Sequence, residues 1–169
     1  MKIFLIGFMG CGKTTLGRKL SKGLDYEFVD LDELIESKAG MTIARYFENF
    51  GEAAFRDLEK TTLQDTPFPE NAVISTGGGT PCFSGNMDWM NNQGITVYLS
   101  LPPAALADRL VRGKAKRPLI KDLSQEELVK YITTKLAERI EYYTQAQHTL
   151  ISIDLTAEKF LEAVPVEKQ

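Results

Sequence analysis

Short apolar runs alternate along this chain with longer segments in which apolar residues recur at helical spacing. The short runs predict strands at 2–6, 27–30, 72–75, 96–99 and 150–153. The longer segments predict helices at 13–22, 33–38, 52–65, 87–92, 102–112, 124–145 and 156–163, with one more that starts at Thr42 and is interrupted at Gly51. Strands that alternate with helices in this way are typical of an α/β fold with a parallel sheet.

The long helix near the end of the chain has the clearest starting signal. Ser124 and Glu127 form a capping box, in which each side chain accepts a backbone N–H of the other residue. The apolar face of this helix consists of Leu128, Ile132, Leu136 and Tyr143. No repeat, low-complexity tract or linker divides the 169 residues, so we expect 1–169 to form a single domain.

A phosphate-binding loop joins the first expected strand to the first expected helix. Residues 7–14 read G-x-x-x-x-G-K-T, the P-loop pattern, in the strand–loop–helix context that this pattern requires. The N–H groups of such a loop surround an anion, and the helix N-terminus adds its dipole. We expect Lys13 to reach the β- and γ-phosphates of a nucleoside triphosphate and Thr14 to bind Mg²⁺. The residues expected to contact the triphosphate are Gly10, Cys11, Gly12, Lys13, Thr14 and Thr15. The alternative is a glycine-rich turn with an incidental lysine.

Composition and charge argue against several other classes of protein. Hydrophobic content of 43% and charged content of 25% are ordinary for a globular protein, and a net charge of −3 argues against a nucleic-acid-binding surface. Cys11 and Cys82 are too few for a disulfide framework and form no zinc motif. The apolar stretch after Lys2 is similar to the start of a signal peptide, but it is too short to cross a bilayer and the P-loop accounts for all of it. We therefore expect a cytoplasmic protein with no membrane or nucleic-acid partner.

Two aspartates, Asp30 and Asp32, follow the second expected strand. Their spacing puts both side chains on one side, at the edge of the sheet where the phosphate-binding loop also lies. The pair can supply an Mg²⁺ ligand and a general base for an acceptor hydroxyl. Because the third strand lacks the terminal aspartate of many P-loop enzymes, Asp30 is the candidate metal ligand. The alternative is a solvated turn in which Asp32 caps the next helix.

Further candidates lie around Gly77–Gly79, three consecutive glycines after the third expected strand. A turn normally needs one residue with positive φ, so three glycines favour close approach by a ligand over a simple loop. Arg56 has Glu59 three residues later, either as a helix pair or as a partner that orients the arginine. The basic segment 113–122 has the composition of a lid over phosphates or of a solvated loop, and in it Arg117 is a candidate for stabilising a transferred phosphoryl group.

Taken together and in order, these motifs resemble those of the shikimate kinases. The resemblance rests on residues 7–17, 30–32, 55–56, 75–79 and 117–119, and it extends over nearly the whole chain. It implies the fold of the nucleoside monophosphate kinases, a three-layer P-loop NTPase fold in which helices flank a five-stranded parallel sheet of order 2-3-1-4-5. It also implies transfer of the γ-phosphoryl group of ATP to the 3-hydroxyl of shikimate, with Mg²⁺ as cofactor.

The resemblance also implies a role for each candidate at the acceptor and metal sites. Thr14 would bind Mg²⁺ directly and Asp30 would hold it through water. Asp32 would bind the ring hydroxyls and accept the proton of the 3-hydroxyl, while Arg56 and Arg139 would grip the carboxylate of shikimate. The remaining implied substrate contacts are Gly77, Gly78 and Gly79, beside a substrate-binding helical region at about 33–60.

On the nucleotide side, the resemblance implies a lid at about 113–122 that brings Arg117 onto the ATP phosphates. Lys13, Asp32 and Arg117 would then be the catalytic residues. Arg112 would lie near the adenine, with Arg109 as the alternative. Cys11 is a departure, since the family more often has Ala or Ser there, and its similar size implies little effect.

Two rival functions would also use the phosphate-binding loop. Another small-metabolite kinase of the same fold, such as one for gluconate, would differ around Gly77–Gly79. A nucleotide-dependent switch is disfavoured, because the guanine-reading N-K-x-D element is absent from the sequence. We expect a monomer whose partners are the small molecules shikimate and ATP.

Overall fold

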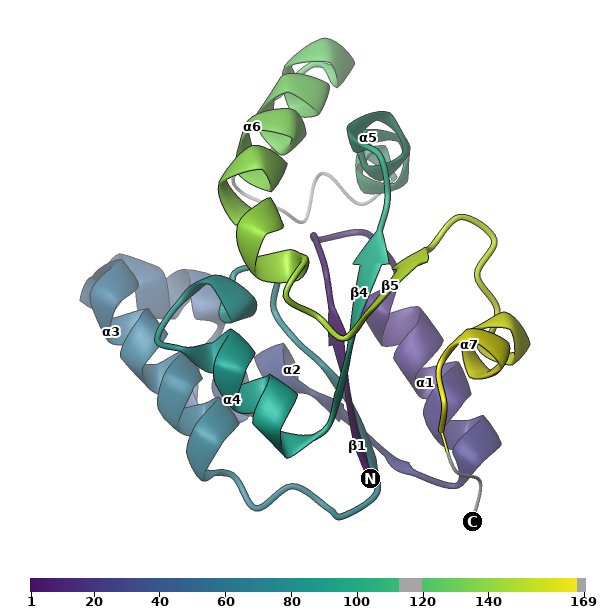
Figure 1. The fold of residues 1–169 in the computed structure, drawn as a ribbon. Helices are drawn as coiled ribbons and strands as arrows, with labels where there is room; N and C mark the ends of the chain where they lie inside the picture. Colours follow the sequence, from purple (N-terminus) through teal and green to yellow (C-terminus); the bar gives the residue numbers. More distant parts are fainter. Residues whose placement is uncertain (113–119, 167–169) are drawn as a thin grey trace.

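The structure is a computed structural model that describes residues 1–112 and 120–166. Across these residues, five parallel strands form one sheet: β1 (Lys2–Ile6), β2 (Glu27–Asp30), β3 (Ala72–Ser75), β4 (Ile95–Ser100) and β5 (His148–Ile151). Their order is β2-β3-β1-β4-β5 (Figure 1), which confirms the order that the resemblance implies. The carboxyl ends of the strands therefore share one edge, and the candidate site is found there.

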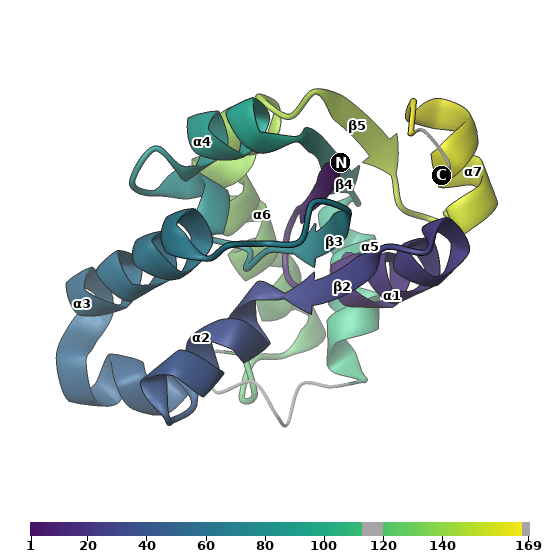
Figure 2. The same cartoon turned by 90° about the horizontal axis from the view of Figure 1, so that it is seen from below.

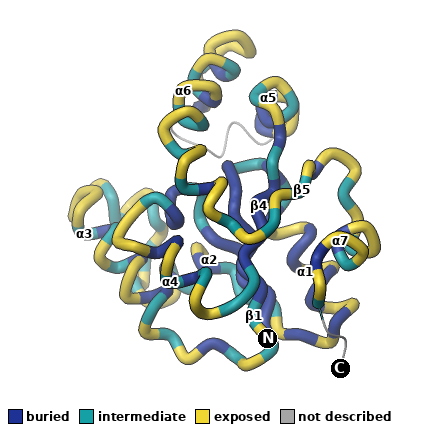
Figure 3. Tube along the Cα trace, viewed as in Figure 1, coloured by how far each residue is buried: buried dark blue, intermediate teal, exposed yellow. Residues whose placement is uncertain are grey.

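The middle strand, β1, shows why the sheet carries a layer of helices on each face. Ile3, Phe4, Leu5 and Ile6 are fully buried, as expected for a strand that is covered on both sides. Successive side chains point to opposite faces, so Ile3 and Leu5 belong to one core cluster and Phe4 and Ile6 to the other. Figure 3 shows the buried trace running through the sheet, with exposed positions along the outer sides of the helices.

The helices divide between the two faces (Figures 1 and 2). One face is covered by α1 (Lys13–Leu24) and α7 (Ala157–Ala163), and the other by α2 (Leu31–Ala39), α3 (Ile43–Asp65) and α4 (Asn86–Gln93). Two further helices, α5 (Pro103–Val111) and α6 (Gln125–Tyr143), pack together beyond the carboxyl end of β4. A short 3₁₀ helix, η1 (Thr80–Cys82), follows the three glycines and was not predicted.

Helix signals in the sequence agree well with the structure. The capping box is present, with Glu127 N 3.2 Å from Ser124 Oγ and Ser124 N 2.7 Å from Glu127 Oε2. Gly51 has a φ of 79° and interrupts the helical backbone of α3, as expected. Among the described residues, no helix combines the length and the apolar character that crossing a membrane requires.

β5 begins two residues earlier than the apolar run predicts. His148 pairs with Val97, and the strand ends at Ile151. The side chain of Gln147 donates to the carbonyl of Asn91 in α4 at 3.2 Å and to that of Gly94, just before β4, at 3.3 Å, which anchors the chain before its apolar residues begin. β5 is an edge strand, and its Ile151 is 70% exposed. Apolar side chains are therefore not a reliable guide to which residues of β5 pair with β4.

Candidate active site

The phosphate-binding loop connects β1 to α1 in the expected way. Gly12 is the N-cap of α1 with a φ of 100°, a conformation that favours glycine, and no side chain caps the first turn. The first N–H groups of α1 therefore remain available to an anion. Lys13 is nearly buried, and its ammonium donates to Gly7 O at 2.7 Å and to Phe8 O at 3.0 Å. Its charge is thus held inside the loop by neutral carbonyl groups.

Beside the loop, a hydroxyl from the first turn of α1 meets a carboxylate and a hydroxyl at the ends of two neighbouring strands, β2 and β3. Thr14 Oγ1 donates to Asp30 Oδ2 at 2.9 Å and lies 3.3 Å from Ser75 Oγ. Thr14 and Asp30 are the two residues predicted to hold Mg²⁺, and hard oxygen atoms of this kind are what the ion prefers. Sequence analysis did not single out Ser75 as part of this group, although its place at the end of β3 was a usable signal.

Asp30 also sets the start of α2. Its Oδ1 accepts the backbone N–H groups of Asp32 at 3.1 Å and Glu33 at 3.4 Å, so Asp30 is the N-cap. The alternative in which Asp32 caps this helix is therefore wrong. Both oxygens of Asp30 are engaged, while the side chain of Asp32 projects from the first turn of the helix.

Asp32 faces a cleft of about 400 Å³ between the phosphate-binding loop and the turn after β3. The residues lining this cleft include Lys13, Thr14, Asp30, Asp32, Gly77 and Gly78. The pKa of Asp32 is raised to about 6, first by the protein atoms that surround the carboxyl and exclude water, and then by the negative charge of Asp30. Lys13 acts in the opposite direction. The carboxyl group stays accessible from the cleft, so it can exchange a proton with a bound molecule.

Each glycine of Gly77–Gly79 leaves room for one predicted site residue. A Cβ on Gly77 would lie 3.0 Å from Asp32 Oδ1, a Cβ on Gly78 would lie 3.2 Å from Arg139 Nη1, and a Cβ on Gly79 would lie 2.7 Å from Arg56 Nη2. None of the three glycines has a φ in the left-handed region that favours glycine. Space, and not an unusual backbone conformation, is therefore what requires glycine here, and the turn brings the three side chains together.

Arg56 is held on the α3 side of this turn. Its Nη1 donates to Glu59 Oε2 at 2.8 Å, and the Glu59 side chain is almost fully buried. The guanidinium carbon lies 4.0 Å from the ring centroid of Phe83, a favourable cation–π distance. A weaker contact of 3.5 Å joins Nη2 to the exposed Glu52. Glu59 therefore orients Arg56, which was one of the two interpretations of their spacing.

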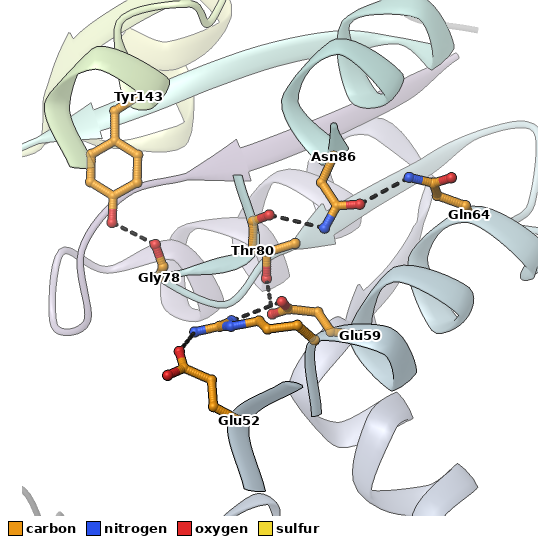
Figure 4. A network of polar contacts seen from close by, with 8 residues as sticks. Glu52, Glu59, Gln64, Gly78, Thr80, Asn86 and Tyr143 are labelled. Atoms are coloured by element: carbon orange, nitrogen blue, oxygen red, sulfur yellow. Dashed lines mark hydrogen bonds and ion pairs between the residues drawn. The ribbon is translucent and has the colours of Figure 1, made fainter. Parts of the chain in front are cut away.

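A chain of hydrogen bonds extends this support into the core (Figure 4). Thr80 Oγ1 donates to Glu59 Oε1 at 2.6 Å, Asn86 Nδ2 donates to Thr80 O at 3.0 Å, and Gln64 Nε2 donates to Asn86 Oδ1 at 3.0 Å. Sequence analysis missed this network, because polar residues in a loop and on two helix faces carry no local sign that they meet. The network fixes the end of the turn next to Arg56.

The predicted nucleotide-side arginines fall in different places. Arg109 donates to Cys11 O and to Ser152 O, both at 3.2 Å, and it lines a second cavity of about 390 Å³ beside the phosphate-binding loop. Arg112 is exposed at the end of α5 and does not line this cavity. Arg117 and most of the expected lid lie outside the described residues. The structure thus puts Arg109, the alternative to Arg112, next to the loop.

Several known proteins with similar sequences are shikimate kinases. The family model described as shikimate kinase matches residues 9–165. A shikimate kinase from Phocaeicola vulgatus is 42% identical over 162 residues, which cover 96% of this chain and 93% of that protein. Another, from Bacteroides thetaiotaomicron, is 45% identical over 148 residues, or 88% of this chain and 85% of that protein.

Solved structures lead to the same group. A crystal structure of shikimate kinase from Bacteroides thetaiotaomicron superposes with a TM-score of 0.89 at 38% identity, covering 96% of this chain and 97% of that one. Shikimate kinase from Acinetobacter baumannii, solved in complex with shikimate, has a TM-score of 0.80 at 35% identity and covers 95% of this chain and 87% of that one.

Proposed function

The chain belongs to the shikimate kinase family, and from this premise we propose that it transfers the γ-phosphoryl group of ATP to the 3-hydroxyl of shikimate. The 3-hydroxyl oxygen attacks the γ-phosphorus, and the bond from this phosphorus to the β,γ-bridging oxygen breaks. The hydroxyl proton passes to a base on the protein. The products are shikimate 3-phosphate and ADP.

On the nucleotide side, the phosphate-binding loop and Lys13 supply positive charge. Phosphoryl transfer has a loose transition state, so catalysis consists mainly of positioning and charge neutralisation. Lys13 would exchange its two carbonyl partners for phosphate oxygens, which are stronger acceptors because they are charged. Arg117 is proposed to add charge from the lid.

Thr14 and Asp30 fit an Mg²⁺ ion, since a hydroxyl and a carboxylate lie together at the mouth of the loop. Thr14 would bind the ion directly and Asp30 would hold it through water. When bound, Mg²⁺ would neutralise part of the negative charge of the phosphates. Asp30 is suited to this task because its capping bonds to the α2 backbone fix its carboxylate in place.

Asp32 is proposed as the base that orients the 3-hydroxyl and receives its proton. A pKa of about 6 leaves the carboxylate mostly ionised near neutral pH, yet more basic than an ordinary aspartate. This raised pKa and the accessibility of Asp32 from the cleft support the assignment.

One observation carries the proposal best: the space beside Gly77, Gly78 and Gly79, where a Cβ would lie, is occupied in turn by Asp32, Arg139 and Arg56. An acceptor for this site needs a hydroxyl for the aspartate and an anionic group for two guanidinium groups. A carboxylate fits, because guanidinium binds it through two parallel hydrogen bonds. Shikimate, a hydroxylated ring with one carboxylate, has both groups.

The experiment is a coupled ADP-release assay with a panel of acceptors: shikimate, its neutral amide, quinate and gluconate. Of the four acceptors, we expect only shikimate to be phosphorylated rapidly, and we expect poor turnover of its amide. The rate should depend strongly on Mg²⁺. Faster phosphorylation of gluconate than of shikimate would overturn the acceptor assignment while leaving the kinase assignment intact. A rate of ADP release that is the same with and without each acceptor would point to a switch protein instead. The molar mass of the protein, measured by light scattering after size-exclusion chromatography, tests the expectation that it is a monomer.

A further inference from the structure

Tyr143 is a buried phenol that joins α6 to the three-glycine turn. Its side chain is 0% exposed at the last residue of α6, and its ring packs against Tyr98 with centroids 5.0 Å apart. The hydroxyl donates to Gly78 O at 2.6 Å, across 65 residues of sequence (Figure 4). A buried hydroxyl needs such a partner, since an unpaired one is destabilising. The bond therefore fixes the middle residue of the turn.

Arg139 lies one helical turn before Tyr143, on the same face of α6. A Cβ on Gly78 would lie only 3.2 Å from Arg139 Nη1, so both side chains reach the turn at the same residue. Burial raises the pKa of Tyr143, while the charge and the hydrogen bonding of Arg139 act in the opposite direction. Burial is the larger influence, so the phenol keeps the proton that it donates to Gly78.

The two predicted acceptor-binding arginines are supported in different ways. Arg56 has a buried carboxylate, Glu59, as its partner. In contrast, the ion pairs found in residues 1–112 and 120–166 include none to Arg139. The guanidinium of Arg139 lies over the ring of Phe8 at 5.5 Å and beside the phenol of Tyr143. Its position thus depends on neutral neighbours, and its charge stays available for an anion.

We propose that Tyr143 is a positioning residue for acceptor binding. The hydroxyl of Tyr143 holds Gly78 and Arg139 in fixed positions relative to each other, so that the carboxylate of the acceptor meets both without rearrangement. This inference rests on the proposed function, because it takes Arg139 as an acceptor-binding residue. Tyr143 does not line the cleft beside the phosphate-binding loop, so it acts through Gly78 and Arg139 and not by touching a substrate. Because these two residues are on the acceptor side, loss of the Tyr143 hydroxyl should weaken acceptor binding and leave ATP binding unchanged.

The experiment compares Tyr143→Phe with Tyr142→Phe, the same change at the neighbouring, partly exposed position of α6. For Tyr143→Phe we expect the KM for shikimate to rise about tenfold, as for loss of one well-placed buried hydrogen bond, with kcat lowered by less than about threefold. The KM for ATP should stay within about twofold of the parent value. Tyr142→Phe should change neither KM.

Two further variants separate positioning from simple packing. With 4-aminophenylalanine at position 143, which keeps a ring donor, the KM for shikimate should return to within about twofold of the parent value. With 4-methylphenylalanine, which has a similar size but no donor, it should stay high. A KM for shikimate in the 4-methylphenylalanine variant that equals the parent value would overturn the proposal. So would a Tyr143→Phe protein that loses thermal stability but keeps the parent KM for shikimate.

A double-mutant cycle with Arg139→Lys tests the link to the arginine. We expect the effect of Tyr143→Phe on the shikimate KM to shrink to less than about threefold in the Arg139→Lys background, because the group being positioned is already impaired. Fully additive effects would overturn the link. If Arg139→Lys raises this KM and Tyr143→Phe does not, only the role of Tyr143 fails. If Arg139→Lys leaves the KM unchanged, the acceptor site of the proposed function fails as well.

Discussion

Replacing Gly79 by alanine would place a methyl group against the guanidinium of Arg56. The new Cβ would lie 2.7 Å from Nη2 and 2.9 Å from Nη1, whereas ordinary van der Waals contact begins at 3.4 Å. Either the guanidinium or the turn must therefore move by roughly 0.7 Å. Arg56 is not free to retreat, because its Nη1 is held 2.8 Å from the buried carboxylate of Glu59.

This displacement should impair acceptor binding more than stability. Gly79 has a φ of −89°, so alanine at this position introduces no backbone strain of its own. A misplacement approaching 1 Å can cost about a hundredfold in rate, so we expect kcat/KM for shikimate to fall by about ten- to a hundredfold. The KM for ATP should stay within about twofold, and the free energy of unfolding should fall by less than about 1 kcal/mol.

Initial rates of ADP release at varied shikimate, together with urea unfolding, measure both effects. Gly23→Ala is the matched control, because a Cβ there meets nothing within 4 Å and the residue lies in α1, away from the cleft. The control should keep the kinetic constants of the parent. A folded Gly79→Ala protein with the parent kcat/KM would refute the reasoning, since Arg56 could then be displaced without consequence for the acceptor.

Four further predictions concern Lys13, the ionisation of Asp32 and the control position Gly23. Lys13→Ala should lower kcat at least about a hundredfold, since preorganised charge of this kind contributes about 3 kcal/mol or more, and near-normal turnover in a folded variant would exclude the lysine from the mechanism. Because the pKa of Asp32 is raised to about 6, activity should increase with pH through this value, and a pH–rate profile of Asp32→Asn should lack the step. The folded protein holds the proton of Asp32 more tightly than the unfolded chain does. The contribution of Asp32 to the free energy of unfolding should therefore decline as pH rises from 3.8 to about 6. Urea unfolding of the parent and of Asp32→Asn at several pH values measures this decline. Gly23→Ala should itself raise the free energy of unfolding by up to about 0.5–1 kcal/mol, and a decrease would show that this exposed position in the last turn of α1 is not an ordinary helical position.

The fold was predictable because its signals are local. Apolar runs mark the buried strands, and the P-loop pattern marks the junction of β1 and α1. β5 was misplaced because an edge strand needs no apolar side chains on its exposed face, and its pairing is fixed by Gln147 instead. Strand order and the names of the acceptor-binding residues came from the resemblance, which carries information that the pattern of this chain does not contain.

Residues that act through distant contacts could not be found from spacing. Arg139 and Tyr143 reach Gly78 only after α6 has packed beside the turn, and nothing in the sequence of α6 marks that contact. Arg109 and Arg112 are three residues apart, so the helical pattern puts them on the same side and cannot choose between them. The choice depends on where α5 ends relative to the phosphate-binding loop: Arg109 lies within the helix and donates to Cys11 O, whereas Arg112 is its C-cap. The role of Arg117 stays a prediction, because it lies outside the described residues.

Asp30 and Asp32 show how the local fold separates two residues that the sequence leaves equivalent. One oxygen of Asp30 accepts backbone N–H groups at the start of α2, and the other accepts the hydroxyl of Thr14. A carboxylate with both oxygens engaged in this way is held rigidly, which suits a residue that helps to hold a cation. Asp32 lies two residues further on, inside the first turn, where the protein around it raises its pKa to about 6. Because the negative charge of Asp30 contributes to that increase, the capping residue also makes its neighbour a better base. Loss of the charge in Asp30→Asn should therefore lower the pH at which activity rises, even with saturating Mg²⁺.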